Sequence, residues 1–133
     1  MDVAQALADL TEISSQIEAA VLFGADGSVE GSTLADGAAA AALATAAAAL
    51  LERADALRAD GTTVTQLQAA TAEGCVFVVR DGDRRIAATS VANPTVGLVF
   101  YDLKSCLRDS APSAPEAEKP KRRRAAAKDG DEA

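Results

Sequence analysis

The sequence contains no histidine and no tryptophan, and its aromatic side chains are three phenylalanines and Tyr101. Without histidine, the chain can build neither a Ser/His/Asp or Cys/His nucleophile arrangement nor a histidine-bearing metalloprotease helix. So few aromatic rings also provide no stacking platform for single-stranded nucleic acid. These absences exclude the histidine-dependent hydrolases and nucleic-acid binding by base stacking.

Glycine-rich nucleotide-binding motifs are missing as well. Gly24, Gly27 and Gly31 do not have the spacing of a dinucleotide fingerprint, and a second strand rather than a helix is expected after them. No Gly-Lys-Ser/Thr phosphate loop occurs. Asp81 and Asp83 flank a glycine and are expected to form a turn rather than a pair of catalytic acids. The sequence therefore predicts no catalytic residue, cofactor or metal ligand, and the protein is not expected to be an enzyme.

The two cysteines, Cys75 and Cys106, lie in apolar stretches without metal-ligand spacing. We expect them to be buried thiols in a reducing compartment, with Cys75 a core residue rather than a nucleophile. The N-terminus lacks the layout of a signal peptide, and the apolar run 38–51 is shorter and richer in alanine than a typical membrane span. A cytoplasmic protein without a transmembrane segment is expected.

The net charge of −7 is unevenly distributed along the chain. Residues 1–109 contain 7 Lys and Arg against 15 Asp and Glu, which disfavours nucleic acid as a partner of the folded domain. Residues 110–133 have no large apolar side chain and are expected to be a disordered tail. The basic run 119–128 within it either binds an acidic surface or anionic lipid or simply keeps the chain soluble.

An alanine-rich segment from Asp36 to Gly61 is the strongest structural signal in the sequence. Alanine is the best helix former, Asp36 can cap the start, and Gly61 follows the last expected turn. One side of the helix is predicted to face the core; it contains Leu43, Ala47, Leu50, Leu51, Ala54 and Leu57. The opposite side is too apolar for a solvated face, so it is predicted to pair with a second copy. The predicted interface contains Ala41, Thr45, Ala48, Glu52 and Ala56. An ordinary alanine-rich surface helix remains the alternative.

The other elements follow from changes of hydrophobic period. A first helix is expected after Asp2, and a last one begins at Asn93-Pro94, with asparagine as cap and proline in the first turn. Strands are predicted at 19–23, 28–34, 62–71, 75–80 and 84–91. The order α-β-β-α-β-β-β-α predicts an α+β fold, a three-layer sandwich around one five-stranded antiparallel sheet.

These residues resemble the Roadblock (dynein light chain) domain family, particularly its bacterial branch found beside small Ras-like GTPases. The resemblance covers the chain from Leu7 to Leu107. It rests on AAVLFGADGSVEGST as the first hairpin, GCVFVVRDGDRRIAATS as the later one and NPTVGLVFYDL at the last helix. It implies a profilin-like sandwich and a homodimer in which the long middle helices pair and the third strands join two sheets.

The resemblance also implies a function, namely non-catalytic regulation or scaffolding of a small Ras-like GTPase. Arg84 and Arg85 are candidate partner contacts, with ordinary solvated strand-end charges as the alternative. The second functional class left open is a small sensor or adaptor module that binds a metabolite or a signalling kinase.

Overall fold

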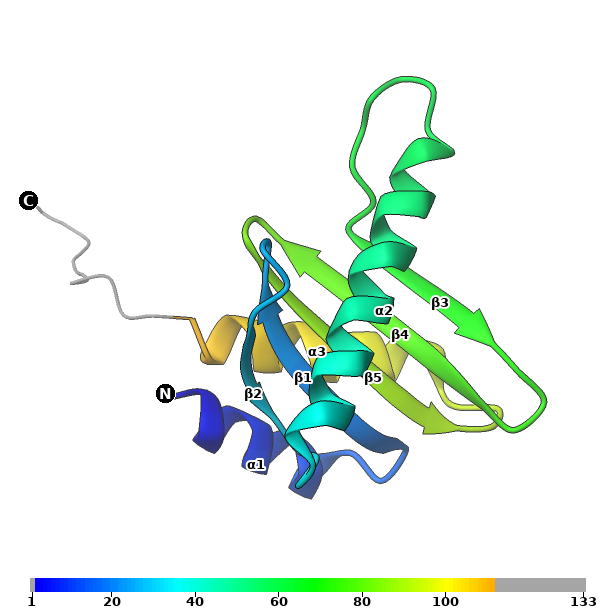
Figure 1. Ribbon diagram of the computed structural model, residues 1–133. Helices are drawn as coiled ribbons and strands as arrows, with labels where there is room; N and C mark the ends of the chain where they lie inside the picture. Colours follow the sequence, from blue (N-terminus) through cyan, green and yellow to red (C-terminus); the bar gives the residue numbers. More distant parts are fainter. Residues whose placement is uncertain (1, 112–133) are drawn as a thin grey trace, which may run out of the picture.

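A computed structural model describes residues 2–111, and the tail predicted at 110–133 lies outside these residues except for its first two positions. Three helices and five strands follow in the predicted order (Figure 1). They are α1 (Val3–Ile13), β1 (Ile17–Gly24), β2 (Val29–Ser32), α2 (Gly37–Ala56), β3 (Gln66–Ala70), β4 (Gly74–Asp81), β5 (Arg84–Val91) and α3 (Val96–Asp109).

The five strands form one antiparallel sheet in the order β2-β1-β5-β4-β3. Tight turns join β1 to β2 and β4 to β5, and Gly27 and Gly82 provide their positive φ angles of 87° and 61°. The chain crosses from β2 to β3 through α2, which leaves β2 and β3 as the two edge strands. The predicted antiparallel five-stranded α+β fold is confirmed.

Alternate residues of the strands point to opposite faces of the sheet, and each face has its own hydrophobic core. Helices α1 and α3 lie together on one face, and α2 alone crosses the other (Figure 1). The α1/α3 core contains Leu7, Leu10, Leu22, Phe77, Ile86 and Leu103, among others. The α2 core contains Val21, Phe23, Val78 and Ala87 beneath Ala40, Ala44, Ala47 and Leu51. The three-layer arrangement expected from the sequence is therefore present.

Two of the predicted helix caps are confirmed and one is wrong. The Asp2 carboxylate accepts a hydrogen bond from the Gln5 amide, and the Asp36 carboxylate accepts one from the Ala38 amide. Helix α3, however, has Thr95 as its N-cap residue, without a side-chain cap hydrogen bond. Asn93 instead adopts a left-handed φ of 54° in the loop before the helix. The amide of Thr95 itself donates to the side-chain oxygen of Gln16, a residue distant in sequence.

The ends of α2 and of the folded domain differ slightly from the expected bounds. Helix α2 ends at Ala56 rather than next to Gly61, because Asp55 is bonded to the Val64 amide and the loop turns back toward the sheet. At the C-terminus, Ser110 is buried, and its amide closes the last turn of α3 on the Cys106 carbonyl. Ser110 therefore belongs to the folded domain rather than to the tail that was predicted to begin there.

Candidate functional site

The candidate site is the outward-facing surface of α2 together with the sheet residues beside it. Ala40, Ala44, Ala47 and Leu51 form the inner face of this helix and are buried against the sheet. Small side chains here let the helix lie close to the strands. The outer side carries mostly alanine and leucine, so α2 presents apolar surface away from its own core.

The division of α2 into two sides differs from the prediction. Leu50 and Leu57 were expected in the core but are 37% and 85% exposed. Of the predicted interface residues, Ala41, Thr45, Glu52 and Ala56 are exposed, whereas Ala48 is half-buried and packs against the chain's own core. The helix is rotated about its axis relative to the predicted orientation. Three alanines and Leu51 pack against the sheet, whereas the larger side chains of Leu50 and Leu57 do not.

One flank of α2, here called the apolar flank, combines exposure with a mostly apolar surface, in which the exposed Arg53 is the charged position. Its exposed apolar residues are Ala39, Ala46, Leu50 and Leu57, and Leu43 is half-buried at its base. These positions follow helical spacing and form one stripe. The residues of α2 that lie beside the β1–β2 turn, including Thr45, Ala48 and Glu52, belong to the other flank, so the stripe faces away from that turn. Strand β3 lies on the side of α2 away from the β1–β2 turn (Figure 1). An apolar stripe of this kind on the described domain has the character of a contact surface.

Strand β3 supplies a second contact surface beside the apolar flank. It pairs only with β4, so its outer backbone groups have no strand partner within the described domain. Its sequence, QLQAA, contains none of the charges or prolines that usually protect an edge strand from pairing with another chain. The apolar flank and the β3 edge are thus both suited to association.

By length and composition, α2 is also the one helix among residues 2–111 that could cross a membrane. The sequence analysis expected no membrane-spanning segment because the apolar run 38–51 is short, whereas the helix itself extends over 20 residues. Core helices of soluble proteins have the same length and composition. The inner face of α2 packs on the sheet of its own domain, so only the outer side of the helix presents apolar surface for another molecule.

Arg84 and Arg85 were both candidate partner contacts, and as neighbouring residues of a strand they point to opposite faces of the sheet. The Arg84 guanidinium lies on the α1/α3 side, where it donates hydrogen bonds to the Leu107 carbonyl (2.8 Å) and the Ser110 hydroxyl (3.1 Å). It also pairs with Glu30 at 2.9 Å, and only 17% of its side chain is exposed. Arg84 therefore holds the end of α3 against the sheet and has little free surface.

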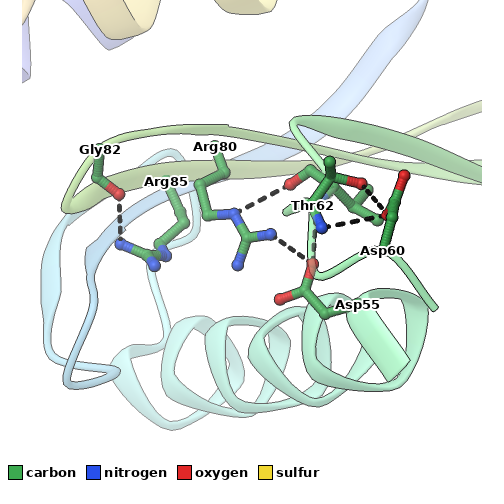
Figure 2. A network of polar contacts seen from close by, with 7 residues as sticks. Asp55, Asp60, Thr62, Arg80, Gly82 and Arg85 are labelled. Carbon is green, nitrogen blue, oxygen red and sulfur yellow. Dashed lines mark hydrogen bonds and ion pairs between the residues drawn. The ribbon is translucent and has the colours of Figure 1, made fainter. Parts of the chain in front are cut away.

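Arg85 lies on the α2 side of the sheet, directly across from Arg80 of β4. The Arg80 side chain donates to the Val64 carbonyl (2.9 Å) and pairs with Asp55 (2.6 Å), as Figure 2 shows. Asp55 also accepts the Val64 amide at 2.7 Å. This network fixes the α2–β3 loop to β4. The Arg80 hydrogen bond and the Val64 amide lower the pKa of Asp55.

The α2–β3 loop is further ordered by Asp60, which accepts hydrogen bonds from Arg58 and from the hydroxyl and amide of Thr62. These contacts lower the pKa of Asp60 to about 2. Figure 2 places this second acidic group next to the Asp55–Arg80 network. The two carboxylates act locally, as anchors for a loop that contains no regular structure.

Arg85 differs from both of its arginine neighbours in having no carboxylate partner among the described residues. Its one hydrogen bond goes to the Gly82 carbonyl at 3.0 Å. The half-buried side chain lines a recess of about 410 Å³ between α2 and the β1–β2 turn. The recess is also lined by Gly24, Ala25, Thr45, Ala48, Ala49, Leu51, Glu52 and Arg80.

The cysteines and the paired aspartates lie where the sequence suggested. Cys75 and Cys106 are buried free thiols, and burial raises the pKa of Cys106 to about 11. Asp81 and Asp83 are exposed around the β4–β5 turn. Within residues 2–111, no group of three His, Cys, Asp or Glu side chains is arranged to hold a metal ion.

One buried carboxyl was not anticipated. Asp102 of α3 is 6% exposed, and no hydrogen bond or ion pair to it occurs among the described residues. Burial raises its pKa. Of the positions one turn away, Val99 and Cys106 belong to the predicted apolar stripe, so helical spacing could have placed Asp102 on the buried side.

Solved structures share this architecture. A Roadblock/LC7 domain from Streptomyces avermitilis has a TM-score of 0.74 and 18% identity, over 82% of this chain and 94% of that one. MglB of Myxococcus xanthus has a TM-score of 0.69 and 14% identity, over 80% and 83% of the two chains. An MglB structure with a tetrameric arrangement has a TM-score of 0.70 and 14% identity, over 81% and 84%. The sequence matches no protein-family model and no curated protein. The chain therefore has the Roadblock/LC7 fold.

Proposed function

We propose that the protein is a cytoplasmic, homodimeric, non-catalytic regulator or scaffold of a small Ras-like GTPase. The observation that carries the proposal is the apolar flank of α2 lying beside an unprotected β3 edge. Regulation of a GTPase is what the resemblance to the bacterial Roadblock branch implies, and the fold agrees with that resemblance.

The dimer explains both contact surfaces with one symmetric arrangement. If two β3 strands pair antiparallel across a two-fold axis, their sheets continue into one another, and the apolar flanks of the two α2 helices approach on the same face. Ala39 and Ala46 allow close approach, while Leu50 fills the space between the helices. This assigns the seam to the apolar flank rather than to Thr45, Ala48 and Glu52, which line the recess on the other side. A tetrameric arrangement of an MglB shows that a protein of this fold self-associates.

A Leu50→Asp variant tests the dimer. The wild type should have the mass of a dimer by light scattering at micromolar concentration, and the variant the mass of a monomer, because burying an unpaired charge costs several kcal/mol. Leu98→Asp is the matched control, since Leu98 is an exposed leucine on α3, over the opposite face. A monomeric wild type, or an L50D variant that remains a dimer, would contradict this arrangement.

The GTPase function is tested with purified small Ras-like GTPases, each loaded with GDP or with a non-hydrolysable GTP analogue. Switch segments are ordered by the γ-phosphate, so binding should depend on the nucleotide, by about tenfold or more. In single-turnover hydrolysis at saturating dimer, no arginine variant that still binds should lower the rate by the roughly 10³–10⁵ typical of an arginine finger. Negligible affinity for both nucleotide states across the panel would favour the sensor or adaptor module instead.

A further inference from the structure

Arg80 and Arg85 form an unusual pair within the sheet. They occupy directly opposed positions of β4 and β5 and extend from the same face. Like charges in such cross-strand positions destabilise a sheet. Asp55 forms an ion pair with Arg80, whereas Arg85 forms no direct ion pair with a carboxylate among residues 2–111 and interacts with Asp55 only at longer range. A local arrangement that costs stability without a visible compensation is expected at a functional position.

The surroundings of Arg85 define what it can bind. Its single hydrogen bond to the Gly82 carbonyl leaves most of its guanidinium N–H groups free, beside a recess of about 410 Å³. The recess walls are small and apolar at Gly24, Ala25 and Ala49, which leaves room for an entering side chain. Glu52 also lines the recess, so a multiply charged phosphate would meet stronger repulsion there than a singly charged carboxylate. The recess suits a single carboxylate.

We propose that Arg85 binds an aspartate or glutamate side chain of the partner protein, which enters the recess beside α2. This inference rests on the proposed function, with the small GTPase as the partner. It assigns partner binding to Arg85 alone of the two candidate arginines, because Arg84 is already bonded to Glu30, Leu107 and Ser110. The recess lies on the flank of α2 opposite the proposed dimer seam, so both copies of a dimer keep it open.

The binding experiment compares the wild type with Arg85→Gln, Arg85→Lys and the control Arg108→Gln. Arg108 is an exposed arginine on α3, over the opposite face, and its loss changes the net charge equally. Affinity for the GTPase that the wild type binds should fall about ten- to hundredfold in R85Q, because a charge-assisted hydrogen bond is lost. R85K keeps the charge without the fork and should lose less. R108Q should bind like the wild type.

Two measurements on the isolated protein examine Arg85 without any partner. Phenylglyoxal, followed by peptide mass mapping, should modify Arg85 faster than Arg80 and Arg84, whose guanidinium groups are bonded to carboxylates. The melting temperature of R85Q should equal or exceed that of the wild type, since a like-charge contact is removed. A fall as large as that of Arg80→Gln would show that Arg85 has a structural role and would overturn the inference.

The outcomes distinguish this inference from the proposed function. If the wild type binds a GTPase and R85Q binds it equally tightly, the inference is wrong and the function stands. Equal losses in R85Q and R108Q would point to general electrostatic attraction and would also overturn it. If the wild type binds no GTPase in either nucleotide state, the function and the inference fail together.

Discussion

The two faces of the sheet are covered in different ways. On one face, α1 and α3 together bury large side chains such as Leu10, Phe77 and Leu103, and Phe77 meets Phe100 edge-to-face at 5.0 Å. On the other, α2 alone covers the strands, mainly with alanines. Two helices can close a five-stranded sheet, whereas one helix leaves sheet and helix flanks open. The closed α1/α3 face buries more of the large side chains, and the open α2 face leaves exposed the surfaces that we propose for partner binding.

Charged residues follow the same division. On the closed face, Arg84 is engaged with a carboxylate and two backbone or hydroxyl oxygens. On the open face, Arg80 is engaged but Arg85 is not. Adjacent positions of one strand therefore have separate roles, one in holding α3 and the other at a recess.

The largest effect on stability is expected on the closed face. Phe77→Ala should lower the free energy of unfolding by roughly 3–5 kcal/mol, because Phe77 is fully buried and its removal leaves a cavity. Urea unfolding of the L50D background, where no dimer contributes, is the measurement. Val78→Ala on the α2 face is the comparison and should cost less. A greater loss in V78A would reverse the assignment of stability to the two faces.

A smaller but clear effect is expected from Arg80→Gln. This variant removes the hydrogen bond to the Val64 carbonyl and the ion pair with Asp55, so the α2–β3 loop should loosen. We expect a melting temperature lower by several degrees and faster hydrogen exchange of the Val64 amide. Arg58→Gln, in an exposed pair with Asp60, is the control and should change little. Unaltered exchange at Val64 would show that Arg80 does not anchor the loop.

Asp102 predicts a pH-dependent effect on the closed face. Because burial raises its pKa above the ordinary 3.8, the stability linked to Asp102 is fully present below that pH and is lost as the pH rises through the folded-state pKa. Asp102→Asn should therefore raise the melting temperature at neutral pH, with a gain that shrinks toward about pH 3.8. Asp109→Asn, more exposed on the same helix, is the control. A gain independent of pH would contradict this cause.

Acid should weaken the α2–β3 loop on the open face, which is the opposite of its effect through Asp102. Asp55 and Asp60 have lowered pKa values, so their contribution is present above the ordinary value of 3.8 and is lost as the pH falls through their folded-state pKa values, which for Asp60 is about 2. In the R80Q variant this acid sensitivity should be smaller. Melting curves of the wild type and R80Q from neutral to acidic pH compare the two, and identical acid sensitivity would argue against the network.

The smallest effect is expected from deleting residues 112–133. Their composition contains no large apolar side chain, so removal should leave the melting temperature and the dimer mass nearly unchanged. The deletion begins after Ala111 because Ser110 is buried and bonded to Arg84. A large fall in melting temperature would show that the tail contributes to the fold.

The order of elements, the antiparallel sheet and the caps at Asp2 and Asp36 followed from the sequence because each depends on residues near one another in the chain. Hydrophobic period, turn glycines and short polar caps act over a few residues. The predicted start of α3 at Asn93-Pro94 was wrong. The helix begins at Val96, and the amide of the preceding Thr95 is bonded by Gln16 from a different part of the chain. The sequence analysis also did not separate the roles of Arg84 and Arg85, although the alternation of side chains along a strand places them on opposite faces of the sheet.

The rotation of α2 was decided by tertiary packing. Its sequence is apolar on almost every side, so helical period alone cannot choose the buried face, and the structure buries Ala40, Ala44, Ala47 and Leu51 while leaving Leu50 exposed. The sequence determined that a long apolar helix would form and that a single sheet would lie beneath it. Which flank stayed open, and which arginine lay beside the recess, depended on how closely alanine lets a helix approach the strands.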